Sequence, residues 1–304
     1  MPFRARLGVP RDAAVKTTLT TSDGRKLAYR TAGAGPVLVC HPGGPGLSAS
    51  YLTDLGGIGQ SFTLVLLDPR GTGSSDSPAD PGAYRFDDYV GDIEELRDHL
   101  GLEQISLLGF SHGAMVALSY GIAHPDRAAC LVVAGGAARF GEEQTAEQER
   151  GIARCEAEPW FPKAKAALDL EASGEASPEQ LRQAMADMLP LYFHRYDERA
   201  QHYAAAVEDD VPNADAMRSW ETDGFPTFDV RGELPSITAP TLVLTGDDAF
   251  VTGPACAREV AALVPDSELV ILPECGHMLW VEQRDAFAAA VTRFLLNGEE
   301  LEPE

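Results

Sequence analysis

Short apolar runs alternate with amphipathic stretches over the first 136 residues of the chain. The stretches 89–102 and 111–125 carry apolar residues at the spacing of an α-helix. Four other runs are almost continuously apolar, which is typical of strands buried on both faces of a sheet: residues 36–40, 62–68, 105–110 and 129–136. The alternation of buried strands with helices predicts an α/β fold with a mostly parallel, doubly wound sheet.

The sheet pattern extends toward both ends of the chain. Residues 15–31 predict two short strands around Ser22-Asp23-Gly24, because Asp-Gly is a strong hairpin signal. The strand and helix pattern returns near the other end, in segments 239–246, 254–264, 268–273 and 284–296.

The alternation stops between about residue 140 and residue 233, where the chain becomes helical and more polar. Ser177, Pro178 and Gln180 predict one helix start there, with serine as N-cap, proline in the first turn and glutamine closing a capping box. We therefore expect a core built from residues 1–138 and 235–304, interrupted by a helical cap of residues 139–234.

The net charge and the cysteine content restrict the possible binding partners and the cellular compartment of the protein. The 304 residues include 47 Asp and Glu against 24 Lys and Arg, a formal charge of −23. Such a surface repels phosphate backbones and anionic membranes, so we expect a small-molecule substrate and neither nucleic acid nor a membrane as partner. Five cysteines without a C-x-x-C pair, and an N-terminal segment without an apolar signal stretch, favour a cytoplasmic protein.

The segment Gly109-Phe110-Ser111-His112-Gly113 matches G-x-S-x-G between a predicted strand and a predicted helix. A sharp strand-to-helix turn strains the serine and lifts its hydroxyl above the sheet. Glycine on both flanks avoids clashes, and the helix N-terminus stabilises negative charge. Ser111 is therefore the candidate nucleophile, with an ordinary glycine-rich turn as the alternative.

A serine nucleophile also needs an oxyanion hole, which consists of two backbone N–H donors aimed at the tetrahedral intermediate. His112, directly after the nucleophile, is expected to supply one donor. The glycine-rich loop after strand 36–40 is expected to supply the other, from Gly44, because glycine lets the backbone approach the substrate closely.

The candidate base and acid come from the end of the chain. His277 follows the strand 268–273, and a residue at that end of a parallel strand faces the same edge of the sheet as Ser111. Asp248 follows the strand 240–245 and is the candidate acid that would orient His277. An aspartate in such a loop is more often a turn former, so both roles stay open for Asp248.

Five segments together resemble the α/β-hydrolase superfamily: HPGGPG (41–46), DPRGTGSS (68–75), GFSHG (109–113), PTLVLTGDD (240–248) and GHMLWVEQRDAF (276–287). They are most similar to its proline-iminopeptidase-like branch. The resemblance covers about two-thirds of the chain and implies the α/β-hydrolase fold. It also implies a serine hydrolase that acts, without metal or organic cofactor, on a small ester, amide or N-terminal peptide.

The chain departs from that pattern at the acid and in the cap. The resemblance places the acid at Ala249. Either Asp248 serves through a shifted loop, or the acid is missing, natively or through an introduced Asp-to-Ala change. The glutamate segments by which iminopeptidases hold a free amine are echoed by Trp220-Glu221 and 198–203, but in reverse order. Pro42 is also inserted beside His41.

Substrate residues are expected in the cap and around the nucleophile: Trp220, Glu221, Glu208, Phe110 and Phe250. Glu208 and Glu221 would bind an amine, whereas the aromatic residues would favour an apolar or ring-bearing substrate or only pack the cap on the core. The alternatives are an esterase, a lactonase or a hydrolase of carbon–carbon bonds. A binding protein that has lost turnover is the alternative of another class, and Ala249 is the feature that points to it.

Overall fold

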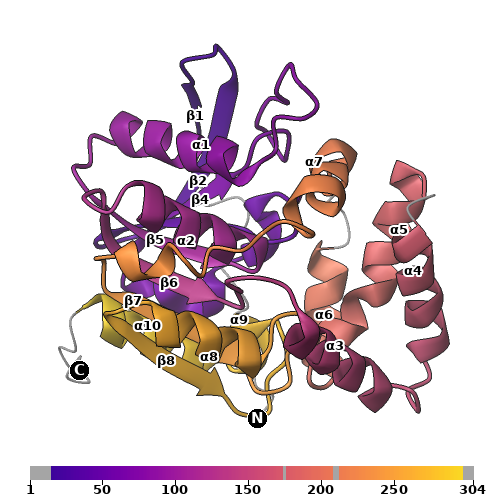
Figure 1. The fold of residues 1–304 in the computed structure, drawn as a ribbon. Helices are drawn as coiled ribbons and strands as arrows, with labels where there is room; N and C mark the ends of the chain where they lie inside the picture. The colour runs from indigo at the N-terminus through magenta and orange to yellow at the C-terminus, as the bar shows by residue number, and fades with distance from the viewer. Residues whose placement is uncertain (1–14, 174–175, 208–211, 297–304) are drawn as a thin grey trace, which may run out of the picture.

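A computed structural model describes residues 15–173, 176–207 and 212–296 of the chain. These residues form an eight-stranded sheet with the strand order β1-β2-β4-β3-β5-β6-β7-β8 (Figure 1). The strands are β1 (Val15–Thr20), β2 (Lys26–Gly33), β3 (Val37–His41), β4 (Thr63–Asp68), β5 (Ile105–Phe110), β6 (Ala128–Ala134), β7 (Thr241–Gly246) and β8 (Ser267–Leu272). Each strand predicted from an apolar run is present, so the α/β fold with a mostly parallel sheet is confirmed.

Only the first strands run antiparallel. β1 pairs with β2, and β2 with β4, in antiparallel register, whereas every pairing from β4 through β8 is parallel. The β1–β2 hairpin turns at Gly24, whose φ of 87° suits glycine. Because the parallel strands share one direction, the loops after β3, β5, β7 and β8 meet at one edge of the sheet.

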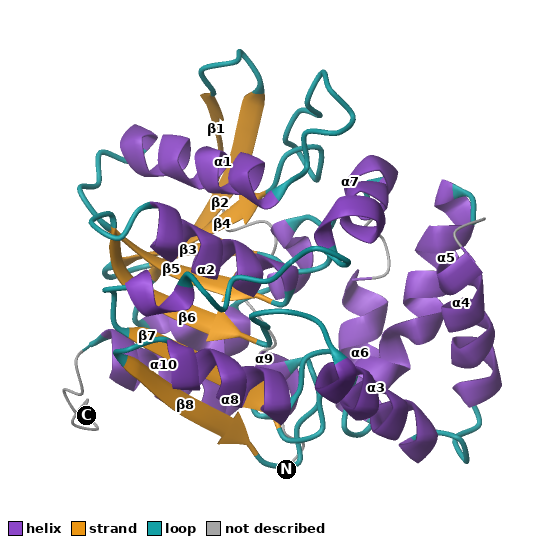
Figure 2. Ribbon diagram, viewed as in Figure 1, coloured by secondary structure: helices purple, strands orange, loops and turns teal. Residues whose placement is uncertain are grey.

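Helices cover both faces of the sheet (Figure 2). The helices α1 (Phe86–His99), α2 (His112–Ala123) and α8 (Pro254–Leu263) share one buried apolar cluster with the sheet. The helices α9 (Leu279–Glu282) and α10 (Arg284–Leu295) share the other, with the short helices η2 (Ala49–Leu52) and η3 (Leu55–Gln60). The buried strands therefore have apolar partners on both sides, as their continuous apolar runs require.

The first core helix begins earlier than the pattern 89–102 predicts. Phe86 lies one helical turn before Val90 and packs against the core, and the Asp88 side chain accepts a hydrogen bond from the Arg85 N–H at 2.9 Å. That bond satisfies a backbone donor at the helix N-terminus and starts α1 at Phe86. The helix ends at His99, and Gly101 follows with a positive φ of 67°.

The chain between β6 and β7, called the cap below, is helical. It contains α3 (Glu142–Arg154), α4 (Phe161–Ser173), α5 (Pro178–Met188), η4 (Leu189–Tyr192), α6 (Glu198–Val207), α7 (Ala214–Ser219), the π-helical turn η5 (Trp220–Gly224) and η6 (Leu234–Ser236). Figure 1 shows α3 to α6 grouped on one side of the sheet, with α7 apart from them. The predicted capping box at Ser177 is confirmed, because Ser177 and Gln180 exchange side-chain-to-backbone hydrogen bonds.

Within the described ranges, no helix combines the length and apolar character needed to cross a bilayer.

Candidate active site

Ser111 occupies the sharp turn between β5 and α2. Its φ of 54° and ψ of −119° lie outside the regions that non-glycine residues ordinarily adopt. The backbone N–H of Ser111 donates to the Ala134 carbonyl at 2.8 Å, and the Ser111 carbonyl accepts from Ala114. The turn is therefore held from both the neighbouring strand and the helix, which keeps a strained backbone in place.

Glycines beside Ser111 are required by close backbone contacts. A β-carbon on Gly109 would lie 2.0 Å from the Gly113 carbonyl oxygen, and one on Gly113 would lie 2.4 Å from the His41 carbonyl oxygen. Both distances are far below van der Waals contact. The G-x-S-x-G pattern therefore lies on the strand-to-helix turn that it predicts.

The glycine-rich loop after β3 lies directly against this turn. A β-carbon on Gly43 would come within 2.5 Å of the Ser111 Cβ. The Gly43 N–H donates to the Tyr51 hydroxyl at 2.5 Å, so it is committed to that partner. Gly44 follows with a φ of 58°. The structure thus brings the predicted donor loop to the candidate nucleophile.

His277 is buried at the same edge of the sheet, with 1% of its surface exposed. Its ring lies 4.7 Å from the Phe110 ring and 5.7 Å from the Tyr192 ring, measured between centroids. Neither ring nitrogen has a hydrogen-bond partner among the described residues. Burial without a partner lowers the pKa of His277 to about 4, since water no longer stabilises the charged imidazole.

Asp248 does not reach His277. Its carboxylate accepts a hydrogen bond from His194 Nδ1 at 2.7 Å and forms an ion pair with Arg154. Both partners belong to the cap, so Asp248 joins the cap to the core. The proposed role of Asp248 as the acid that orients His277 therefore has no support in the geometry.

Ala249 lies in the same loop and is buried, with 4% of its surface exposed. Its methyl group can neither accept a hydrogen bond nor carry a charge. The other loop beside His277 offers no carboxylate either: it begins at Gly135, where an added β-carbon would lie 3.2 Å from His277 Nδ1. The described residues thus supply a serine and a histidine without the third member of a triad.

Glu282 holds the loop that carries His277. One carboxylate oxygen accepts from the Gly276 N–H at 2.7 Å, and the other accepts from the His194 N–H at 2.7 Å and the Arg195 N–H at 3.3 Å. Burial raises the pKa of Glu282 to about 7. Glu282 therefore ties the histidine loop to the cap segment after Tyr192, a role that the sequence analysis missed.

The predicted cap aromatic residue Trp220 lies against the side chain of His112, the first residue of α2. Its ring lies 5.2 Å from the His112 ring, 5.4 Å from the Phe140 ring and 6.0 Å from the Phe225 ring, measured between centroids. Phe225 is exposed at the surface. An aromatic cluster therefore runs from the surface to the residue that follows Ser111.

Phe110 and Phe250 are two further predicted substrate residues. Phe110 packs on His277, and Phe250 lies 5.0 Å from the Tyr192 ring. Glu221 is exposed in η5. Glu208 lies outside the described residues.

Two further cap residues near the site carried no signal in the sequence. Burial, followed by the negative charge of Glu221, raises the pKa of the Glu171 carboxyl. Burial and the charge of Glu171 likewise raise the pKa of the Tyr192 hydroxyl, and the carbonyl of Tyr192 accepts from the His277 N–H at 2.7 Å. The charge of Glu221 thus acts on the Glu171 carboxyl, and Glu171 in turn acts on a residue that contacts His277.

Two other histidines near the nucleophile are also buried. Burial lowers the pKa of His41 to about 4 and that of His112 to about 3. The His41 Nδ1 lies 2.9 Å from the Pro42 carbonyl oxygen, in agreement with a structural role in the loop. In the described part of the chain, no group of three or more His, Cys, Asp or Glu is arranged to hold a metal ion.

Comparison with known proteins identifies the class to which this architecture belongs. The family model described as the alpha/beta hydrolase fold matches residues 36–283. The chain therefore belongs to the α/β-hydrolase family. The chain is also similar to proline iminopeptidases of that family, at 28% and 25% identity.

Three relatives illustrate the range of that similarity. Proline iminopeptidase PfmaB from Pestalotiopsis fici is 28% identical over 274 residues, which cover 86% of this chain and 93% of that protein. RutD from a Caulobacter species, provisionally named a carbamate hydrolase, is 31% identical over 240 residues, 78% of this chain and 82% of its own. The structure of the enol-lactonase from Burkholderia xenovorans has a TM-score of 0.71 at 25% identity and covers 92% of this chain and 100% of that chain. All three names denote hydrolases of different bonds.

Proposed function

We propose that this protein is a serine hydrolase in which Ser111 attacks the carbonyl of a small ester, amide or N-terminal peptide substrate. The observation that carries the proposal is a strained Ser111 next to Phe110, whose ring packs on His277, a buried imidazole with no partner for either ring nitrogen among the described residues. An unpaired buried polar group lowers stability, so its presence at the sheet edge that carries the strained serine favours a chemical role.

The proposed reaction has two half-reactions. His277 takes the proton of the Ser111 hydroxyl as its oxygen bonds to the substrate carbonyl carbon, and the backbone N–H groups of Gly44 and His112 stabilise the oxyanion. The tetrahedral intermediate collapses, and His277 protonates the leaving alcohol or amine. Water then attacks the acyl-enzyme with His277 as base, which releases the acid and restores Ser111.

A basic amine is the substrate feature best supported by the charges of the cap. The charge of Glu221 acts on the buried Glu171 carboxyl, and Glu171 also acts on Tyr192, which contacts His277. A protonated amine between the two carboxylates would relieve their repulsion. Similarity to proline iminopeptidases also favours a substrate with a free N-terminal amine.

A lactone or ester of an apolar acid is the second candidate. The aromatic cluster from Phe225 through Trp220 to His112 would contact an apolar substrate. Similarity to the enol-lactonase supports the same candidate.

The decisive experiment compares the native chain with Ser111→Ala in hydrolysis of p-nitrophenyl acetate and in labelling by a fluorophosphonate probe. We expect both signals in the native chain and neither in the variant. Ser119→Ala is the matched control, because Ser119 lies on α2 and its hydroxyl donates to the Met115 carbonyl. Native protein that neither labels nor hydrolyses would instead favour a binding protein.

A substrate panel then separates the two candidates. Turnover of proline β-naphthylamide, with weak turnover of acyl esters, supports the amine-bearing substrate. The reverse preference supports the ester or lactone.

A further inference from the structure

Asn213 joins the cap to the loop that carries Gly44. Its backbone N–H donates to the Gly46 carbonyl at 2.8 Å. Its side-chain Nδ2 donates to the Gly71 carbonyl at 2.8 Å and lies 3.2 Å from the Tyr84 hydroxyl. Its Oδ1 accepts from the Ala216 N–H at 2.9 Å and so caps the N-terminus of α7. One residue therefore contacts a cap helix and two core loops.

Asn213 packs so closely against Gly46 and Gly71 that neither position has room for a side chain. A β-carbon on Gly46 would lie 2.6 Å from the Asn213 carbonyl oxygen, and one on Gly71 would lie 2.6 Å from the Asn213 Nδ2. Both glycines have positive φ, 87° at Gly46 and 71° at Gly71. The two loops thus close around Asn213 rather than merely passing near it.

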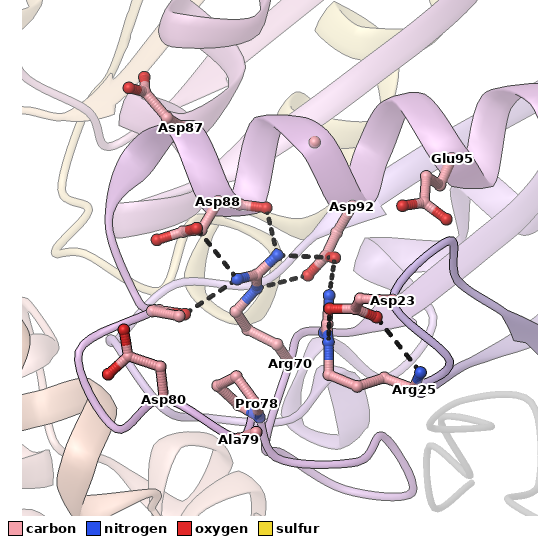
Figure 3. A pocket seen from close by; sticks show the side chains of 12 residues that line it. Asp23, Arg25, Arg70, Pro78, Ala79, Asp80, Asp87, Asp88, Asp92 and Glu95 are labelled. Atoms are coloured by element: carbon pink, nitrogen blue, oxygen red, sulfur yellow. Dashed lines mark hydrogen bonds and ion pairs between the residues drawn. The ribbon is translucent and has the colours of Figure 1, made fainter.

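The loop that receives the Asn213 side chain is itself fixed to the core by Arg70. The guanidinium donates to both carboxylate oxygens of Asp92, at 2.7 and 2.8 Å, and to the carbonyls of Ala83 and Asp88 (Figure 3). Arg70 and Asp92 are both buried, and Asp92 also pairs with Arg25 at 3.0 Å. Because these charges are paired and buried, Arg70 holds the adjacent Gly71 in a fixed position against the core.

A second cap helix contacts the same glycine-rich loop indirectly. The Tyr203 hydroxyl of α6 donates to the Tyr51 carbonyl at 2.8 Å. The Tyr51 hydroxyl in turn accepts from the Gly43 N–H. Cap contacts therefore lie on both sides of Gly44.

We propose that Asn213 is a positioning residue that links the cap to the oxyanion hole, because it fixes the Gly44 loop between α7 and the Gly71 loop. The inference deepens the proposed function and rests on it for the role of Gly44. An oxyanion donor acts only when its N–H points at the developing charge. A loop released from Asn213 would still bind substrate but would stabilise the transition state less.

The test uses two variants that keep the helix cap and remove the Nδ2 donor, Asn213→Ser and Asn213→Asp. Serine and aspartate both cap a helix well. Aspartate also places a carboxylate oxygen against the Gly71 carbonyl. The matched control is Ser177→Ala, which removes the N-cap of another cap helix, where the Ser177 side chain accepts from the Gln180 N–H within its own capping box. Tyr84→Phe removes one Asn213 partner and provides a milder variant.

Two readouts are measured on the full chain. Hydrogen exchange of the segment 41–50 reports the loop without any need for activity, and we expect exchange roughly 10-fold faster in both Asn213 variants, with no change in Ser177→Ala. Steady-state kinetics on an activated ester should give a kcat lower by about 10- to 100-fold with little change in KM. A merely structural role of α7 would instead raise KM, through Trp220 and Glu221 directly after it.

The outcomes separate this inference from the proposed function. Unchanged exchange in both Asn213 variants, or faster exchange with unchanged kcat in a Ser111-dependent enzyme, overturns the inference. Faster exchange in a protein whose native form shows no Ser111-dependent hydrolysis upholds the contact between Asn213 and the loop and rejects the proposed function.

Discussion

The Asp248 carboxylate accepts a hydrogen bond from His194 Nδ1 at 2.7 Å, while neither ring nitrogen of His277 has a hydrogen-bond partner among the described residues. Asp248 lies in the loop from which the family pattern would bring an acid to His277, the candidate base. The carboxylate that is present turns toward the cap, and the position that should carry the acid is Ala249. Asp248 therefore joins the cap to the core, and the neighbouring position, 249, is the one where an acid would act on His277.

Ala249→Asp should therefore raise the activity of the enzyme. A buried carboxylate beside His277 would orient the imidazole and favour its charged form, so the pKa of His277 should rise from about 4. We expect kcat on an activated ester to rise at least about 10-fold, since an aspartate in this role contributes up to about 10⁴-fold in related triads. The pH profile of kcat/KM should move its acidic limb to higher pH.

Ala249→Asn is the matched control for that change, because asparagine has the same size and no charge. An equal gain from asparagine would show that the effect comes from packing. No gain from aspartate would mean that the position is not the vacant acid site.

Asp248→Asn should affect stability more than catalysis. The variant weakens the contacts to His194 and Arg154, which are partly exposed, so we expect a loss of about 1 kcal/mol in the free energy of unfolding. The kcat should stay within roughly 3-fold of the native value, because kinetic losses arise mainly from groups that act on the transition state. Urea denaturation and ester hydrolysis measure the two quantities. Loss of activity with unchanged stability would restore Asp248 as the acid.

The pattern of apolar residues was sufficient to predict the sheet and the place of the candidate nucleophile. Apolar runs such as 36–40 and 105–110 have no other way to bury both faces, and G-x-S-x-G between a strand and a helix is a local signal. His277 was predictable because parallel strands end at one edge. These inferences depend on neighbours in sequence or on the geometry of a sheet.

The contacts between the cap and the core were not predictable in the same way. Asn213 and Gly71 lie 142 positions apart, and nothing in the sequence around Asn213 differs from an ordinary helix cap. Glu171 is one glutamate among many in an acidic chain, and its position near Tyr192 depends on how α4 packs. The direction of the Asp248 side chain depends on the cap residues His194 and Arg154. Such contacts arise from packing of helices whose amphipathic pattern fixes a face but not a partner.

Glu282→Gln should lower kcat and change its pH dependence. The carboxylate accepts N–H groups on both oxygens, from Gly276 and from His194, and an amide offers only one accepting oxygen. Ionisation of the native carboxyl, with a pKa raised to about 7, should raise kcat as the pH passes about 7, because the ionised form holds the histidine loop on both sides. The variant should lack this step and have a kcat lower by roughly 10-fold. A step that persists in the variant would assign the titration to another group.

Glu171→Gln should reduce turnover of amine-bearing substrates selectively. Removal of one of two cap carboxylates weakens attraction for a protonated amine, so kcat/KM for proline β-naphthylamide should fall roughly 10-fold while that for an acyl ester stays unchanged. Asp169→Asn is the control, because Asp169 lies on the same helix and pairs with the exposed Lys165. Equal losses on both substrates would contradict an amine-binding role.

The three buried histidines around the site should make the protein sensitive to acid. Burial lowers the pKa of His277 and His41 to about 4 and that of His112 to about 3, from an ordinary value of 6.5. Between pH 6.5 and about 4, the unfolded chain binds protons at these residues and the folded chain does not, so stability falls as the pH falls through this window.

Glu282 changes the stability with pH in the opposite direction. Its pKa in the folded protein, about 7, lies above its ordinary 4.5, so its contribution is fully present below pH 4.5 and is lost as the pH rises through 7. The stability lost at three histidines on acidification exceeds the stability gained at one carboxyl. The urea midpoint should therefore be lower at pH 4.5 than at pH 7. An equal or higher midpoint at pH 4.5 would show that the imidazoles are already charged in the folded protein. In that case His277 would be a stronger base than its burial indicates, and the gain expected from Ala249→Asp would shrink accordingly.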